Sequence, residues 1–155
     1  MSPLNLLEYN TWANRLIMSN IETMPEDLFD KSVGGSFGSL KATILHLFES
    51  DYLWTQRWKG IPLANIPSWD ANTPTSINKL WLPIQDEMTT LAKNIPPQQN
   101  IHFITRKGAH FNLPFEVIVT HLSHHGSYHR GQITHIIREL GQKPVATDYF
   151  IFSTR

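Results

Sequence analysis

The longest helical pattern in the sequence is PFEVIVTHLSHHGSYHRGQITHIIREL, residues 114–140. Its apolar residues recur at spacings of three, four and seven, the period of a helix with one buried face. Pro114 suits the first helical position, and Gly141 followed by Pro144 ends the pattern. At about 100° per residue, one line of side chains faces the core: Phe115, Leu122, Ile133 and Leu140.

Three further segments carry the same pattern, over about 2–23, 39–58 and 73–95. In the first and third, a capping hydroxyl stands directly before a proline, which is typical of a helix start. Apolar and polar residues alternate over 101–113, which indicates a short β-hairpin. We therefore predict an all-α fold, a four-helix bundle with a possible short hairpin before the last helix, as one domain over 1–155.

Composition excludes several classes of protein. Thirteen basic residues balance thirteen acidic ones, and 41% of residues are hydrophobic, so a disordered chain is excluded and a nucleic-acid binder is disfavoured. No apolar run is long enough to span a bilayer, and the first twenty residues do not resemble a signal peptide, so we expect a soluble, cytoplasmic protein. Because the chain has no cysteine, any metal must be bound by histidine or carboxylate.

Five of the eight histidines lie within the last helical segment. His124 and His135 fall on the face expected to meet solvent, and His121 falls at the rim. His125 and His129 lie on the inner flank, and residues four apart on a helix can present two imidazoles to one ion. Spacing alone allows the pair 121/125 or the pair 125/129, and the position on the helix favours the second.

Two histidines leave a metal site incomplete, so a third ligand must come from another helix. His46 is the only histidine of the second helical segment, and small neighbours leave space around it. Three imidazoles and an open position are typical of a catalytic ion. The alternative is that the pair arises by chance and both rings are packed core residues. The sequence has no Glu-x-x-His pair for a di-iron site and no His-Glu-x-x-His motif.

Residues 125–132, HGSYHRGQ, resemble the His-x-x-x-His-Arg-Gly-Gln signature of the DinB/YfiT-like family of metal-binding four-helix proteins, which is distinct from the polymerase of that name. The segment YNTWAN at 9–14, and His46 followed by Trp54, agree with the resemblance, which covers essentially the whole chain. It implies an up-down-down-up bundle, a homodimer, and a divalent ion, zinc or nickel, held by His46, His125 and His129.

Residues beside these histidines have two interpretations each. Gln132 could hydrogen-bond a ligand from outside the coordination sphere or lie at a helix contact, and Glu49 could orient His46 or be an ordinary solvated carboxylate, which we favour. We expect Arg130 to have a structural role, with pairing at a dimer surface as one possibility. Gly131 would allow the close approach of another helix.

Aromatic residues could line a pocket over the metal, although we expect most of them to be packing: Tyr9, Trp12, Trp54, Trp58, Trp69 and Trp81. The tail at 148–150 could fold back across the mouth of the site.

The resemblance implies a metal-dependent enzyme that activates a small-molecule thiol or water, similar to thiol S-transferases in stress response or detoxification. The thiol would be a low-molecular-weight cofactor or substrate, because the chain has none. The alternatives are a metal-dependent hydrolase and a non-catalytic metal-binding stress-response protein. We expect a small-molecule substrate and neither a nucleic acid nor a membrane as partner.

Overall fold

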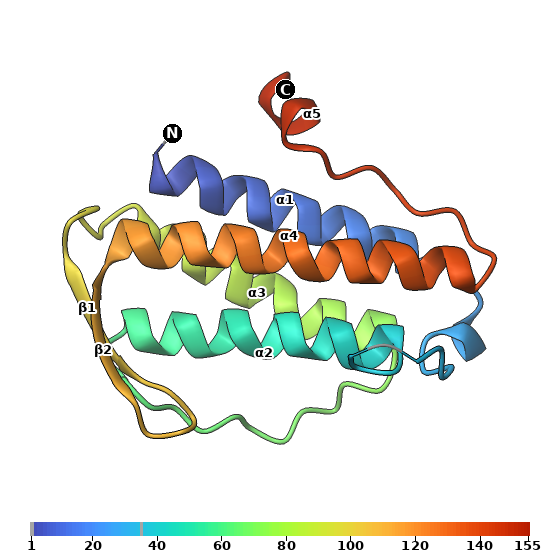
Figure 1. The fold of residues 1–155 in the computed structure, drawn as a ribbon, viewed down its shortest axis with the longest axis horizontal. Helices are drawn as coiled ribbons and strands as arrows, with labels where there is room; N and C mark the ends of the chain where they lie inside the picture. Colours follow the sequence, from blue (N-terminus) through green and yellow to red (C-terminus); the bar gives the residue numbers. More distant parts are fainter. Residues whose placement is uncertain (1, 35) are drawn as a thin grey trace.

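Four long helices make up most of the structure, a computed structural model that describes residues 2–34 and 36–155. They are α1 (Pro3–Glu22), α2 (Leu40–Trp58), α3 (Pro74–Ala92) and α4 (Phe115–Glu139). In Figure 1, α1 and α4 run in one direction while α2 and α3 run in the other. The predicted all-α bundle with up-down-down-up order is therefore confirmed.

Side-chain caps explain where the helices begin. Ser2 accepts a hydrogen bond from the Asn5 N–H, and Ser39 accepts one from the Ala42 N–H. Thr73 and Ser76 cap each other reciprocally at the start of α3. These bonds satisfy amide donors that have no partner within the first helical turn. The predicted starts therefore agree with the structure to within one residue.

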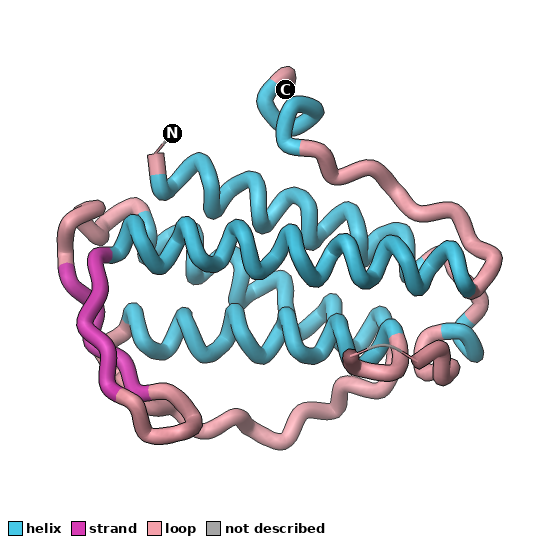
Figure 2. Tube along the Cα trace, in the orientation of Figure 1, coloured by secondary structure: helices cyan, strands magenta, loops and turns pink. Residues whose placement is uncertain are grey.

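The predicted hairpin is present between α3 and α4. Its strands, β1 (Asn100–Ile104) and β2 (His110–Pro114), pair antiparallel with Ile101 opposite Leu113. Gly108 in the turn has a φ of 81°, which glycine adopts without strain. Figure 2 shows the hairpin, in magenta, across one end of the bundle. Two short helices were not predicted, the 3₁₀ helix η1 (Glu26–Leu28) and α5 (Tyr149–Ser153).

Apolar side chains form two core clusters, one toward each end of the bundle. The cluster at the hairpin end includes Trp54, Phe103 and Phe115, and the other includes Phe48 and Trp81. Between them on every helix lie buried polar residues, which we call the central polar layer: Asn10, Asn14, Asp51, Gln85 and Arg130. His129 of α4 is adjacent in sequence to Arg130 of this layer.

The segment after α4 returns along α1 instead of crossing the histidines. The Tyr9 hydroxyl donates to the Thr147 carbonyl oxygen at 3.0 Å, and the Tyr149 hydroxyl donates to Asn5 Oδ1 at 2.7 Å. The expectation that residues 148–150 cover the site is therefore wrong, because the aromatic side chains of α1 provide the apolar surface on which this tail packs. Among the described residues, no helix combines the length and apolar character needed to cross a membrane.

Candidate metal centre

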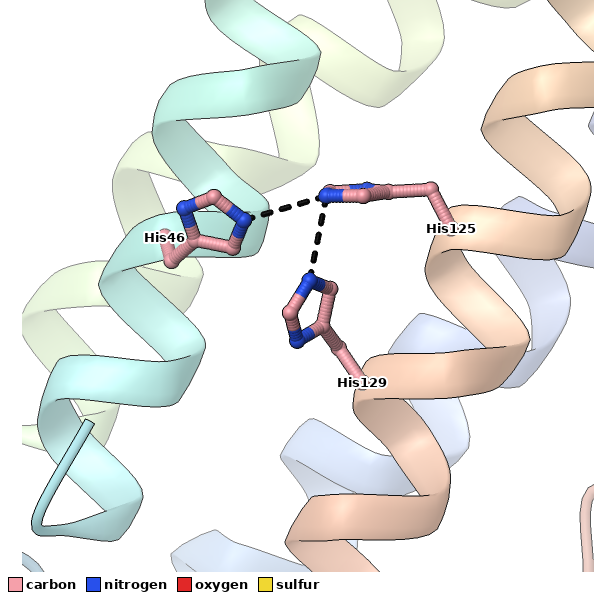
Figure 3. Close-up of side chains that lie close together, drawn as sticks. All are labelled: His46, His125 and His129. Atoms are coloured by element: carbon pink, nitrogen blue, oxygen red, sulfur yellow. Dashed lines mark hydrogen bonds between the residues drawn. The ribbon is translucent and has the colours of Figure 1, made fainter. Parts of the chain in front are cut away.

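Three histidines from two helices converge at the middle of the bundle (Figure 3). His125 Nε2 lies 3.0 Å from His46 Nε2 and 3.1 Å from His129 Nε2. One ring nitrogen from each residue lies within 4.8 Å of the other two. His129 is buried, while His46 and His125 are half-buried, so the cluster can be reached from solvent.

Helix geometry accounts for this convergence. The spacing of four places the rings of His125 and His129 one above the other on α4, with centroids 4.4 Å apart. α2 packs beside α4, and His46 projects from it toward the pair (Figure 3). Of the pairs that spacing allowed, the structure brings 125/129 together with His46. His121 is exposed and packs against Trp54, and His124 and His135 are exposed as expected.

A hydrogen bond to Gln132 determines which nitrogen of His129 is free. Nδ1 of His129 lies 2.7 Å from Gln132 Oε1, and an amide oxygen only accepts. The Nδ1 hydrogen therefore donates to Gln132, and neutral His129 presents a lone pair at Nε2. This is the arrangement in which a partner beyond the metal orients a histidine ligand.

The three facing ring nitrogens cannot all be hydrogen-bonded to one another. When the rings are neutral, His129 Nε2 has no hydrogen to donate, and one hydrogen on the His46–His125 pair forms at most one of the two short contacts. At least one lone pair therefore faces another nitrogen without a hydrogen between them. A cation between the rings would satisfy all three lone pairs, which is what a metal site requires.

Burial keeps these rings in the form that binds a metal. The pKa of His125 is lowered to about 4, mainly by burial and then by the positive charge that His129, His46 and His121 would carry. Burial likewise lowers the pKa of His46 below its ordinary value, followed by the effects of His129 and Arg106. Both imidazoles are neutral at physiological pH and can donate a lone pair.

The donor set fits a divalent ion such as zinc or nickel. At bond lengths of about 2.0–2.1 Å, tetrahedral nitrogen ligands lie about 3.3 Å apart. This is close to the 3.0 Å and 3.1 Å that separate His125 Nε2 from the nitrogens of His46 and His129. Imidazole suits either metal. Three protein ligands leave a fourth position for a water or a substrate atom.

Phe37 is the neighbour that sequence reasoning missed. Its ring stacks on His46 with centroids 4.7 Å apart and meets His129 edge-on at 5.5 Å. The predicted aromatic residues lie elsewhere, since Tyr9 and Trp12 pack against the C-terminal tail and the four other tryptophans pack around the core clusters. Phe37 lies in a loop, where no periodicity shows which way a side chain points.

Glu49 and Arg130 have partners away from the histidines. Glu49 pairs with Arg106 at 3.5 Å, in keeping with the favoured expectation of a carboxylate that does not orient His46. Arg130 is 2% exposed, and its Nη1 donates to Asn10 Oδ1 at 2.7 Å and to Asn14 Oδ1 at 2.8 Å. Its structural role is thus within the chain, and pairing at a dimer surface is excluded by burial.

The expectation for Gly131 is wrong, and Gly126 has that role instead. A Cβ on Gly131 would meet nothing within 4 Å, whereas one on Gly126 would collide with Asn10 Oδ1 and Arg130 Nη1. The absence of a side chain at 126 therefore lets the Asn10–Arg130 pair lie against α4. Sequence alone could not choose between the two glycines, because the choice depends on a side chain of α1.

Comparison with known proteins relates the whole chain to one family. A model of the DinB family matches residues 1–154. Protein DinB of Bacillus subtilis (strain 168) is 25% identical over 175 aligned positions, which cover 97% of this chain and 94% of that protein. The family match therefore spans all four helices, and positions 46, 125 and 129 lie within it.

Proposed function

Since the chain belongs to the DinB family, we propose that it is a divalent-metal enzyme in which His46, His125 and His129 hold an ion that activates a small-molecule thiol for transfer to an electrophile. The observation that carries the proposal is the convergence of three imidazoles whose nitrogens, in the neutral form, have too few hydrogens to satisfy one another. Zinc and nickel are the proposed metals.

Residues of this chain hold the histidine rings in position. A divalent ion in this position would lower the pKa of a thiol or water brought to it, which provides a nucleophile at neutral pH. Gln132 fixes the ring of His129, and Phe37 covers one face of His46 and excludes water there. Because the chain has no cysteine, the thiol comes from a cofactor or substrate.

Metal content is the first test. Protein purified without an affinity tag and loaded with zinc or nickel should hold about one ion per chain by elemental analysis. His46→Ala should lose that ion, because two histidines leave the site incomplete. His124→Ala is the matched control, since this ring is exposed on α4, and it should retain the metal. Equal metal content in all three proteins would overturn the ligand assignment.

Activity is the second test. The loaded protein should transfer a low-molecular-weight thiol to an aryl halide at a rate that rises with thiol concentration, and a chelator should abolish the reaction. Hydrolysis of an activated ester without any thiol would point to water as the nucleophile and a hydrolase instead. A fully loaded protein that binds no thiol would support a non-catalytic metal-binding role.

A further inference from the structure

A hollow of about 240 Å³ opens beside His46 and extends along α2 to the hairpin turn. Its lining includes Glu49 and Arg57 from α2 and Arg106 from the turn. Two guanidinium groups and one carboxylate therefore line a space that begins at a proposed metal ligand. The formal charge of the lining is positive before any ion is bound.

Arg57 is fixed in place without a carboxylate partner. Its guanidinium carbon lies 4.4 Å from the centroid of Trp54 and 5.0 Å from that of Phe103. Nη2 donates to the Ile104 carbonyl oxygen at 3.4 Å, and the buried Nε has no partner among the described residues. Burial, and then the charge of Arg106, lower the pKa of Arg57, so its cation lacks compensation here.

Arg106 has a weak partner that another anion can replace. Its Nη2 lies 3.5 Å from Glu49 Oε2, and the two side chains are 66% and 31% exposed. Exposed pairs of this kind contribute little to stability, because water screens them. A ligand with its own carboxylate or phosphate would therefore meet two cations at little cost in broken contacts.

The hollow on the other side of the histidines has a different character. It measures about 180 Å³ and lies under the loop that carries Phe37. Its lining includes Val33, Ile136 and Glu139, and it contains neither lysine nor arginine. Of these two hollows, only the one on the hairpin side is lined by arginine.

We propose that the hairpin-side hollow binds the anionic end of the molecule whose thiol reaches the metal centre, with Arg106 as the residue that selects a carboxylate or phosphate there. This inference rests on the proposed function and adds the substrate class to it. Arg57 supplies a second, fixed cation, and Glu49 competes with the ligand for Arg106. Removing the charge of Arg106 and removing the charge of Glu49 should therefore change the affinity for the ligand in opposite directions.

The test uses two thiols of equal length, mercaptohexanoate and mercaptohexanol, which differ only in their end group. Binding to the Co²⁺-loaded protein is followed by the sulfur-to-cobalt absorption band in the near ultraviolet. Arg106→Gln should weaken mercaptohexanoate binding about tenfold, because a charge-assisted hydrogen bond is lost. Glu49→Gln should strengthen it several-fold, because the competing carboxylate is gone. Neither variant should alter mercaptohexanol binding.

Lys107→Gln is the matched control, since it removes an exposed cation next to Arg106, and it should leave both affinities unchanged. A loss shared equally by both thiols in Arg106→Gln, or no loss with either, would overturn this inference and leave the metal centre intact. Cobalt that fails to bind, or a band absent with both thiols in the unmodified protein, would overturn the proposed function and this inference with it.

Discussion

Two polar clusters share α4, and they differ in where their partners lie. Arg130 faces α1, where Asn10 and Asn14 accept its hydrogen bonds and the ring of Tyr9 lies 5.3 Å from the guanidinium carbon. The histidine cluster faces α2, and its nitrogens point at one another. In the first cluster both terminal nitrogens of Arg130 have acceptors from this chain, although Arg130 Nε and Asn14 Nδ2 have no partner among the described residues. In the second cluster the short contacts join nitrogens to one another, and a ligand from outside the chain would satisfy them.

The difference separates a stabilising network from a binding site. A buried charge that donates several hydrogen bonds helps to fix the packing of the helices around it, and its loss leaves the acceptors without a donor. Lone pairs that converge without hydrogens cost stability until a cation joins them. We therefore expect changes in the arginine network to affect folding and changes in the histidine cluster to affect metal binding.

The largest effect should follow from removing a histidine. His129→Ala should abolish stoichiometric metal binding while leaving helical content and metal-free stability close to those of the unmodified protein, because the lost ring faces other lone pairs. Metal titration by calorimetry and circular dichroism measure the two properties. His135→Ala, an exposed ring on the same helix, should change neither. Metal retained by His129→Ala would contradict the comparison.

Removing the buried guanidinium of Arg130 should lower the stability of the protein and leave metal binding unchanged. Arg130→Met should lower the free energy of unfolding by about 3 kcal/mol, because Asn10 and Asn14 lose a charged donor in a buried site. Urea denaturation measures the loss, and Arg138→Met provides an exposed control on α4, with a change within about 0.5 kcal/mol. Metal stoichiometry at saturating metal should stay the same. A variant as stable as the unmodified protein would show that the network contributes nothing.

Gln132 tests whether the hydrogen bond to His129 contributes to metal affinity. Gln132→Leu should weaken metal binding by about 10- to 100-fold, because His129 loses the acceptor that fixes its ring. Competition with a chelator of known affinity measures the change. Gln142→Leu lies beyond the helix and should have no effect. An unchanged affinity in Gln132→Leu would show that the ring is held by packing alone.

The two glycines of α4 should respond in opposite directions. Gly126→Ala should destabilise the protein by about 1–3 kcal/mol, because the new methyl collides with the Asn10–Arg130 pair. Gly131→Ala should stabilise it by about 0.5–1 kcal/mol, because the site is open and alanine favours a helix. Thermal or urea unfolding of both variants gives the sign directly, and equal shifts would be inconsistent with the close approach at 126.

Protonation of Asp51 should make the stability of the metal-free protein depend on pH. Burial raises the pKa of Asp51 to about 7, although the Trp81 N–H and then Arg130 lower it in part. Between pH 4 and 7 the unfolded chain loses this proton first, so the stability that Asp51 contributes falls as pH rises. Asp51→Asn removes the effect. The stability of the unmodified protein minus that of Asp51→Asn should therefore decrease from about pH 4 to about pH 7 in urea titrations, and a constant difference would refute the assignment.

Burial of His125 acts with the opposite sign. The pKa of His125 is about 4 in the folded chain and about 6.5 in the unfolded chain. As the pH falls below about 6.5, His125 is therefore protonated in the unfolded chain before it is protonated in the folded chain. Stability from this source is therefore lost on acidification. The pH dependences of stability that Asp51 and His125 contribute partly offset each other in the metal-free protein. In Asp51→Asn, the contribution of His125 is therefore easier to observe.

Local patterns predicted much of the fold. Caps, prolines and apolar spacing located four helices and the hairpin, because each of these signals acts within a few residues. The spacing of His125 and His129, with one histidine on the second helix, selected the side chains that the structure brings together. Whether these hold a metal stays a prediction.

Features that depend on contacts between distant segments were not predictable. The position of Phe37 depends on a loop, and that of Arg106 depends on how the hairpin turn meets α2. Gly126 could be distinguished from Gly131 only through Asn10, which is far away in sequence. The tail packs on α1 because the aromatic surface there is exposed to it in three dimensions, which no helical period shows.

The pairing of the first helix with the last has a consequence for synthesis of the chain. Arg130 and Asn10, which close the central polar layer, are separated by 120 positions. A nascent chain therefore exposes the part of α1 that packs on α4 until α4 has left the ribosome, and contacts between distant segments slow folding. Fragments that stop before α4 should be targets for chaperones and proteases, so the cell obtains either the whole bundle or none of it.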